Sequence, residues 1–280
     1  MQFYLAAGIG DTLPRGRFRP VRAAYRLGPR LLSAVGNAPV QGGLMLVGDS
    51  RECGSSDVLA RDIMRECLRR KYDGVVLDWY HNGADRGTLT ARIGQLCAQY
   101  GCRLFVPEPY AAYAAHATVL INTAVTNGTL KGYLNDAVRR FGASRIALDL
   151  ERLRLDFTLP HSSNIRRPLS APELRRLKEG KPVYDSQELC ARYFNYRSGN
   201  DNHYVLFDDA RTLRVKASTA ENMGIREGFF MLPEVADIAG ELLGYRQSRC
   251  GPFLLPSSRK VCFPLSAKKI ATRSGGGFFH

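Results

Sequence analysis

Short apolar runs alternate with longer amphipathic stretches along most of this chain. The runs have the length of strands, and the stretches repeat apolar residues every three or four positions, as helices do. Strand alternating with helix predicts a parallel sheet, because each helix is long enough to cross between neighbouring strands. The predicted strands are Phe3–Ala7, Gly43–Val47, Gly74–Trp79, Arg103–Val106, Thr118–Asn122, Arg145–Leu150 and Gly228–Leu232, and the predicted helices are Ser56–Arg70, Leu89–Tyr100, Leu130–Phe141 and Leu213–Met223.

The predicted strands are apolar on both faces, which is typical of strands covered by helices. The fold class predicted is therefore α/β, a TIM-type (β/α)8 barrel. Its amino-terminal strands are complete only if Val21–Tyr25 forms the eighth strand. Residues 1–246 are predicted to be this barrel, with a polar insertion at about 161–202 and a capping box that starts a helix at Ser170. Residues 247–280 are predicted to be a basic tail.

Basic side chains outnumber acidic ones by 40 to 26, giving a net charge of +14. The excess is concentrated at the two ends, since Asp11 is the only acid before Gly48 and no acid follows Glu241. Such ends favour an anionic polymer as a partner, while arginine-rich surfaces that are only solvated remain the alternative.

Cysteine and histidine are scattered in the sequence. The seven cysteines form no Cys-x-x-Cys pair, and the five histidines have no zinc-like spacing, so no metal and no cofactor is expected. The amino-terminal residues lack the pattern of a signal peptide, which predicts a protein that is cytoplasmic at synthesis. No apolar run reaches the length of a membrane span.

The segment Asp73-Gly74-Val75-Val76-Leu77-Asp78-Trp79-Tyr80 resembles the fourth-strand signature of family 18 glycoside hydrolases, Asp-Gly-x-Asp-x-Asp-x-Glu. Residues 145–160 are similar to that family's seventh strand and the following loop. Residues 203–232, which include Lys216, resemble the segment that leads into the eighth strand, and they look most like the branch containing bacterial spore cortex-lytic enzymes. The resemblance spans about residues 43–232.

The resemblance implies a substrate-assisted hydrolysis in which the last acid of the signature protonates the leaving oxygen. Here the three acidic positions of the signature are Val76, Asp78 and Tyr80. A phenol with an ordinary pKa near 10 is a poor acid for this step at neutral pH. The family's Tyr-Asp pair on the sixth strand corresponds to Ala124 and Val125. We therefore expect a pseudoenzyme, with no hydrolysis of the family type.

The hypothesis that follows is a chitinase-like barrel that binds an amino-sugar glycan, such as peptidoglycan or chitin fragments. Met231 stands where the family places a tryptophan under the sugar, and Trp79 is predicted to point away, beneath the helices. The predicted ligand-binding residues at the mouth of the barrel are Asp78, Tyr80, Glu108, Tyr110 and Met231.

Two other functions remain open. One is a glycoside hydrolase whose acids have been relocated among Asp78, Glu108, Glu151 and Glu234. The other is a structural or assembly protein that docks through its basic ends on an anionic surface. Association with a spore is implied by the resemblance alone, and the oligomeric state is left open.

Overall fold

The structure, a computed structural model, describes residues 1–34, 42–79, 84–159 and 166–244. The predicted basic tail, 247–280, lies outside these residues. In the described part of the chain no helix is long and apolar enough to cross a membrane.

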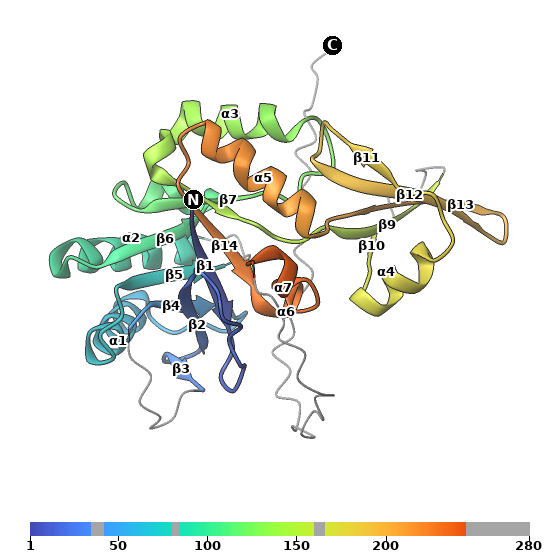
Figure 1. The fold of residues 1–280 in the computed structure, drawn as a ribbon. Helices are drawn as coiled ribbons and strands as arrows, with labels where there is room; N and C mark the ends of the chain where they lie inside the picture. Colours follow the sequence, from blue (N-terminus) through green and yellow to red (C-terminus); the bar gives the residue numbers. More distant parts are fainter. Residues whose placement is uncertain (35–41, 80–83, 160–165, 245–280) are drawn as a thin grey trace, which may run out of the picture. The chain divides into compact units, whose positions relative to one another are not determined.

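Eight parallel strands form a closed barrel (Figure 1), which confirms the predicted fold class. Each strand pairs with the next around the wall, and the last pairs with the first. In order around the wall the strands are β1 (Gln2–Ala7), β2 (Arg19–Arg26), β4 (Leu44–Gly48), β5 (Gly74–Asp78), β6 (Arg103–Pro107), β7 (Thr118–Asn122), β8 (Ile146–Asp149) and β14 (Glu227–Met231).

The strand whose existence the sequence left open is β2. It pairs in parallel with β1 on one side and with β4 on the other, with Val21 opposite both Ala6 and Leu44. A two-residue strand, β3 (Leu32–Ser33), continues the sheet antiparallel to β2. The barrel is therefore complete at its amino-terminal strands.

The helical layer around the barrel is less regular than the strands. Among the described residues no helix connects β1 to β2, and only a short 3₁₀ helix connects β6 to β7. The outer side of β1 is nevertheless buried, because Leu5 packs in one cluster with Leu213 and Leu242. The helices of the layer are α1 (Ser56–Arg69), α2 (Ala84–Tyr100), α3 (Leu130–Phe141), α5 (Ala210–Asn222), α6 (Leu232–Val235) and α7 (Ala239–Leu242), with 3₁₀ helices η1 (Glu108–Tyr113) and η2 (Ala143–Arg145).

Side chains fill the barrel, as is usual for this fold. The rings of Tyr4 and Phe229 stack with centroids 4.5 Å apart, and Phe105 meets Phe229 edge to face at 5.0 Å. At the amino-terminal end of the wall, Arg103 donates to both the Tyr4 hydroxyl (2.8 Å) and the Glu227 carboxylate (2.6 Å). The interior cluster also contains Ala6, Val21, Leu44, Leu46, Val76 and Ala147.

An antiparallel sheet of five strands is inserted between β8 and α5 (Figure 1). The insertion is longer than predicted, because 154–159 and 201–207, which the sequence suggested were a loop and a lead-in to the eighth strand, pair with each other. Its elements are β9 (Arg154–Leu159), β10 (Arg166–Pro168), α4 (Ala171–Lys178), β11 (Tyr184–Ser186), β12 (Ala191–Ser198) and β13 (Asp201–Phe207), with strand order β10-β9-β13-β12-β11.

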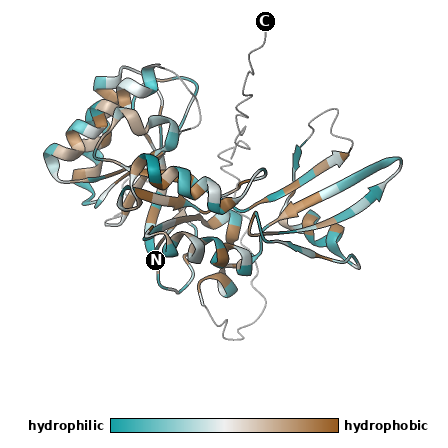
Figure 2. Ribbon diagram, turned by 90° about the horizontal axis from the view of Figure 1, so that it is seen from above, coloured by the Kyte–Doolittle hydropathy of each residue, from teal (hydrophilic) through white to brown (hydrophobic). Residues whose placement is uncertain are grey.

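The two faces of the inserted sheet differ. One face is covered by α4, whose capping box at Ser170 and Glu173 forms as predicted. Leu174 of α4 packs there against Phe194 and Phe207. The strands are apolar next to the barrel and hydrophilic where β12 turns into β13 (Figure 2), so the sheet is anchored at one end only.

Candidate functional site

The mouth of the barrel, at the carboxyl ends of the parallel strands, carries a polar cluster from β7 and β8. Asn122 and Asp149 are the last residues of these strands and are direct neighbours across the sheet. Side chains alternate along a strand, so Asn122 lies on the same side as Leu120, and Asp149 on the same side as Ala147, both of which belong to the interior cluster. Their side chains therefore reach the mouth from inside the wall.

The Asn122 side chain joins two carboxylates. Its Nδ2 donates to Asp149 Oδ2 at 3.0 Å and to Glu151 Oε2 at 2.5 Å. Its Oδ1 accepts the backbone N–H of Ala124 at 2.7 Å, which fixes the orientation of the amide. The barrel of this chain thus presents an amide with two partly exposed acids, in a region where barrel enzymes bind their ligands.

The fourth-strand residues alternate as the signature requires. Val76 packs inside the barrel near Leu46 and Phe105, and Asp78 is placed two residues further toward the mouth, opposite Gly48 of β4. Asp78 is only partly buried. Tyr80 lies outside the described residues, so its predicted place at the mouth stays a prediction.

Met231, the last residue of β14, packs against the interior cluster and remains partly exposed at the mouth. Its Cα is opposite Ala6 of β1. The structure therefore brings Asp78, Asn122, Asp149 and Met231 to the same end of the barrel.

The prediction that Tyr110 lines the mouth is wrong. Tyr110 is 3% exposed and packs edge to face against Trp79 in the cluster beneath α1 and α2. Burial, and then the negative charge of Asp49, raise the pKa of Tyr110 to about 12. The physical reason is that η1 starts immediately after β6 and turns this side chain behind the wall. Trp79 is buried there as predicted.

Glu108 also faces away from the mouth, which corrects its predicted role. Pro107, at the end of β6, shares the inward side with Phe105, so the next residue points to the helical layer. The Glu108 carboxylate accepts the Tyr133 hydroxyl at 3.0 Å and pairs with Arg140 of α3. Burial and the Glu108 charge raise the pKa of Tyr133.

Ala124 and Val125, aligned by the sequence with the family's Tyr-Asp pair, lie beyond the end of β7. Ala124 is buried with Leu153 and Leu206 at the base of the inserted sheet, and Val125 packs against an outer cluster. The side chain that β7 directs to the mouth is Asn122. The alternation of Leu120 and Asn122 was the signal that could have identified it.

A row of aromatic rings across the inserted sheet was missed by sequence reasoning. The rings lie on the face that α4 does not cover, in the order Phe157, Tyr204, Tyr193 and Tyr184, and belong to β9, β13, β12 and β11. Successive centroids are 6.0, 5.2 and 5.4 Å apart. The same face continues into the small cluster at Ala124 and Leu153, just beyond Asn122 and Glu151.

The remaining candidate acid, Glu234, is tied to the backbone that follows β8. Glu234 Oε2 accepts the backbone N–H of Arg152 at 3.3 Å, and the Arg152 guanidinium bonds the Glu234 carbonyl at 3.0 Å. No group of three metal-ligating side chains occurs among the described residues. Within the same part of the chain, five cysteines are all unpaired.

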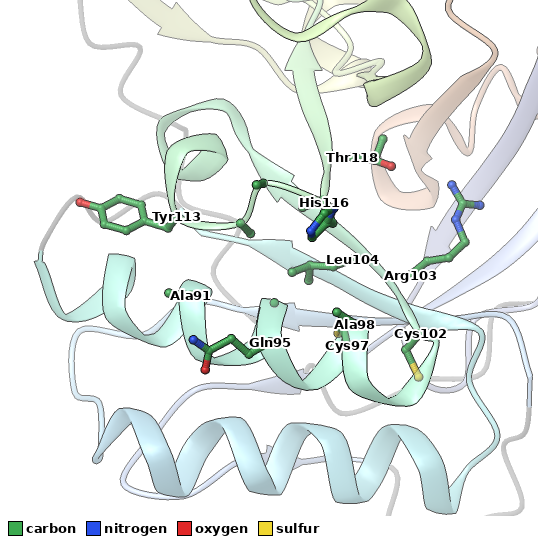
Figure 3. A pocket seen from close by; sticks show the side chains of 14 residues that line it. Ala91, Gln95, Cys97, Ala98, Cys102, Arg103, Leu104, Tyr113, His116 and Thr118 are labelled. Carbon is green, nitrogen blue, oxygen red and sulfur yellow. The ribbon is translucent and has the colours of Figure 1, made fainter.

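A cavity of about 340 Å³ lies outside the barrel wall, between α2 and the segment from Tyr113 to Thr118 (Figure 3). Leu104 and Cys97 form part of its lining, and both belong to the hydrophobic cluster beneath α1 and α2. This cavity is separate from the barrel mouth and holds none of the predicted site residues.

No protein-family model matches the chain, and none of the curated proteins matches it. Solved structures do. The chitinase from Chromobacterium violaceum superposes with a TM-score of 0.61 at 15% identity, covering 86% of this chain and 98% of that one. The spore cortex-lytic enzyme SleL from Bacillus megaterium gives 0.59 at 14% identity, covering 83% and 71%.

Human YKL-39, described as a pseudo-chitinase with retained chitooligosaccharide binding properties, gives a TM-score of 0.57 at 9% identity, covering 87% of this chain and 95% of that one. Identities this low establish the fold only. The chain therefore has a TIM-type barrel fold similar to those of chitinases and spore cortex-lytic enzymes, the glycoside hydrolase family 18-like fold that its fourth-strand motif resembles.

Proposed function

We propose that this protein binds an amino-sugar glycan along the aromatic row and the barrel mouth, and does not hydrolyse it by the family mechanism. The observation that carries the proposal is the row of four rings from Phe157 to Tyr184, which leads to the small cluster beside Asn122. The pseudo-chitinase with the same fold is a precedent for binding without turnover.

The chemistry of the row suits a sugar chain. The apolar face of a pyranose packs on aromatic rings, and tyrosine adds a hydroxyl at low cost in side-chain entropy. Tyr184 is 49% exposed and Tyr193 is partly exposed, so ring surface is accessible to a ligand. Asn122, with Asp149 and Glu151 beside it, supplies hydrogen-bonding groups for hydroxyl and acetamide groups at the end of the row.

The expected lack of turnover rests on the fourth strand. Val76 is 3% exposed inside the barrel and cannot hold or share a proton. Tyr80 is aligned with the proton donor, and its phenol is a poor acid at neutral pH. The finer assignment to peptidoglycan and to a spore follows from the spore cortex-lytic enzymes among the similar structures, and it is part of the same proposal.

One observation favours a second candidate, a hydrolase with relocated acids. Asp149 and Glu151 both contact Asn122 Nδ2, so two carboxyl groups meet at the mouth. Glycosidases use paired carboxyl groups about 5–10 Å apart. Of the acids considered from the sequence, Glu151 supports this candidate through its contact with Asn122, and Asp78 reaches the same end of the barrel. Glu108 is instead paired on the outside of the wall.

Calorimetry with chitooligosaccharides and muropeptides tests binding. We expect weak binding by the wild type and its loss in a Tyr184→Ala, Tyr193→Ala double variant. Tyr100→Ala is the matched control, because Tyr100 is 50% exposed at the end of α2 and contacts no other aromatic ring among the residues that the structure describes. Equal heats for the wild type and the double variant with every glycan would refute the proposal.

Product analysis by mass spectrometry on the same glycans tests turnover. We expect no released product from the wild type, and none from Tyr80→Glu alone, because Val76 and Met231 also differ from the family pattern. Product release that Glu151→Gln abolishes would instead establish the relocated hydrolase.

A further inference from the structure

A buried ion pair lies behind the polar cluster at the mouth. Lys216 Nζ, from the middle of α5, is 2.7 Å from Asp208 Oδ2, and both side chains are 0% exposed. Two full charges in a protein interior are unfavourable unless their geometry and their remaining hydrogen bonds are satisfied. Leucine or methionine would fill the same space without this cost. Filling space in the core therefore does not explain why charged residues occupy these two positions.

The pair holds the backbone that follows two barrel strands. Lys216 Nζ donates to the carbonyl of Thr123, directly after β7, at 3.1 Å. Asp208 Oδ2 accepts the N–H of Leu153, four residues after β8, at 3.0 Å, and the Asp208 N–H donates to the Leu153 carbonyl at 2.8 Å. Thr212 Oγ1 donates to Asp208 Oδ1 at 2.8 Å, which fixes the carboxylate on α5.

These anchors stand next to the residues of the mouth. Thr123 follows Asn122, and its N–H and its hydroxyl both bond the Asp149 carbonyl, at 2.9 and 3.2 Å. Leu153 is two residues beyond Glu151. The contact of Asn122 with Glu151 is therefore fixed from both sides by one buried pair.

We propose that Lys216 and Asp208 are positioning residues for the mouth, which set the place of the Asn122 amide relative to Asp149 and Glu151. This inference rests on the proposed glycan-binding function. Loss of the Lys216 ammonium releases the Thr123 carbonyl, and the Asn122 side chain moves with it. Neither Lys216 nor Asp208 touches the ligand, since both are wholly buried.

Lys216→Met tests the proposal, because it keeps the length of the side chain and removes the charge. We expect chitooligosaccharide binding to weaken at least tenfold, together with a shift of the Asn122 side-chain amide resonances in the NMR spectrum. Leu59→Ala is the control. Leu59 is buried between α1 and the barrel wall, so truncating it destabilises the fold away from the mouth. That control should lower the melting temperature and leave both readouts unchanged.

If Lys216→Met does not fold, the double variant Lys216→Met, Asp208→Asn removes both charges and is measured in the same way. Unmoved Asn122 resonances in a folded Lys216 variant would overturn the inference, as would equal losses of binding in that variant and in Leu59→Ala. If the wild type binds no glycan, the proposed function fails. The Asn122 resonances then decide the positioning role alone.

Discussion

Trp79 and Tyr110 pack edge to face behind the barrel wall, with ring centroids 5.7 Å apart and planes at 88°. Both are 3% exposed, so they stabilise the layer between the strands and α2. Truncating a buried aromatic side chain leaves a cavity that costs about 3–5 kcal/mol. The Trp79–Tyr110 contact should therefore contribute to the stability of the fold and not to ligand binding at the mouth.

We therefore expect Tyr110→Ala to lower the free energy of unfolding by about 3 kcal/mol. Because Tyr110 does not reach the mouth, glycan affinity should stay at the wild-type value. Urea unfolding measures the first quantity and calorimetry the second. A variant as stable as the wild type that no longer binds glycan would return Tyr110 to the binding site.

A substitution at Glu108 tests whether its carboxylate takes part in glycan binding or turnover. Its partners are Arg140, which is 55% exposed, and Tyr133. Partly exposed ion pairs contribute little, so Glu108→Gln should reduce stability by less than about 1 kcal/mol. The variant should bind glycan as the wild type does, whereas Glu151→Gln should alter binding. Turnover that depends on Glu108 would contradict the placement of its carboxylate against α3.

Most strands were predictable from sequence because each is a buried apolar run closed by a change of polarity. The strand at Val21–Tyr25 was left open because Arg22 interrupts its apolar run and is only partly buried. The insertion was harder to delimit. Its strand β9 alternates Leu155 and Phe157 with the buried Asp156, and it pairs with β13, which lies more than 40 residues along the chain. Local pattern carries no information about such a partner.

The mouth was only partly predictable for a similar reason. The alternation of side chains along β5 correctly predicts that Asp78 reaches the mouth, because this prediction depends on one strand alone. Glu108 and Tyr110 were misplaced, since the 3₁₀ helix η1 starts directly after β6 and redirects the chain there. The aromatic row depends on the register of four strands, which a single sequence does not specify.

The capping box of α4 gives a pH-dependent prediction. Hydrogen bonds from the Ser170 side chain and backbone, and then from Arg167, lower the pKa of Glu173 from 4.5 to about 2. A carboxyl group whose folded pKa is depressed stabilises the fold above its unfolded pKa, and this stabilisation is lost as the pH falls toward 2. An NMR titration of the Glu173 carboxyl carbon should therefore have its midpoint near 2. In Ser170→Ala the midpoint should rise toward 4.5, and an unchanged midpoint would show that the capping box does not hold this carboxylate.

Docking on an anionic surface, the third candidate function, depends on the basic ends of the chain. Arg15, Arg17 and Arg19 are exposed between β1 and the start of β2, and none has an ion pair within the described residues. Attraction between exposed charges is screened within about 8 Å at physiological ionic strength, so binding to a polyanion through them must weaken steeply as salt rises.

We expect the triple variant Arg15→Gln, Arg17→Gln, Arg19→Gln to elute from a polyanion column at lower salt than the wild type, with an unchanged melting temperature. Deletion of 247–280, which carries six basic and no acidic residues, should have the same effect and leave the barrel folded. Arg30→Gln is the control, because Arg30 is already paired with Asp62 at 2.6 Å. Elution of all four proteins at one salt concentration would exclude the ends as an anion-binding surface, and with them the docking function.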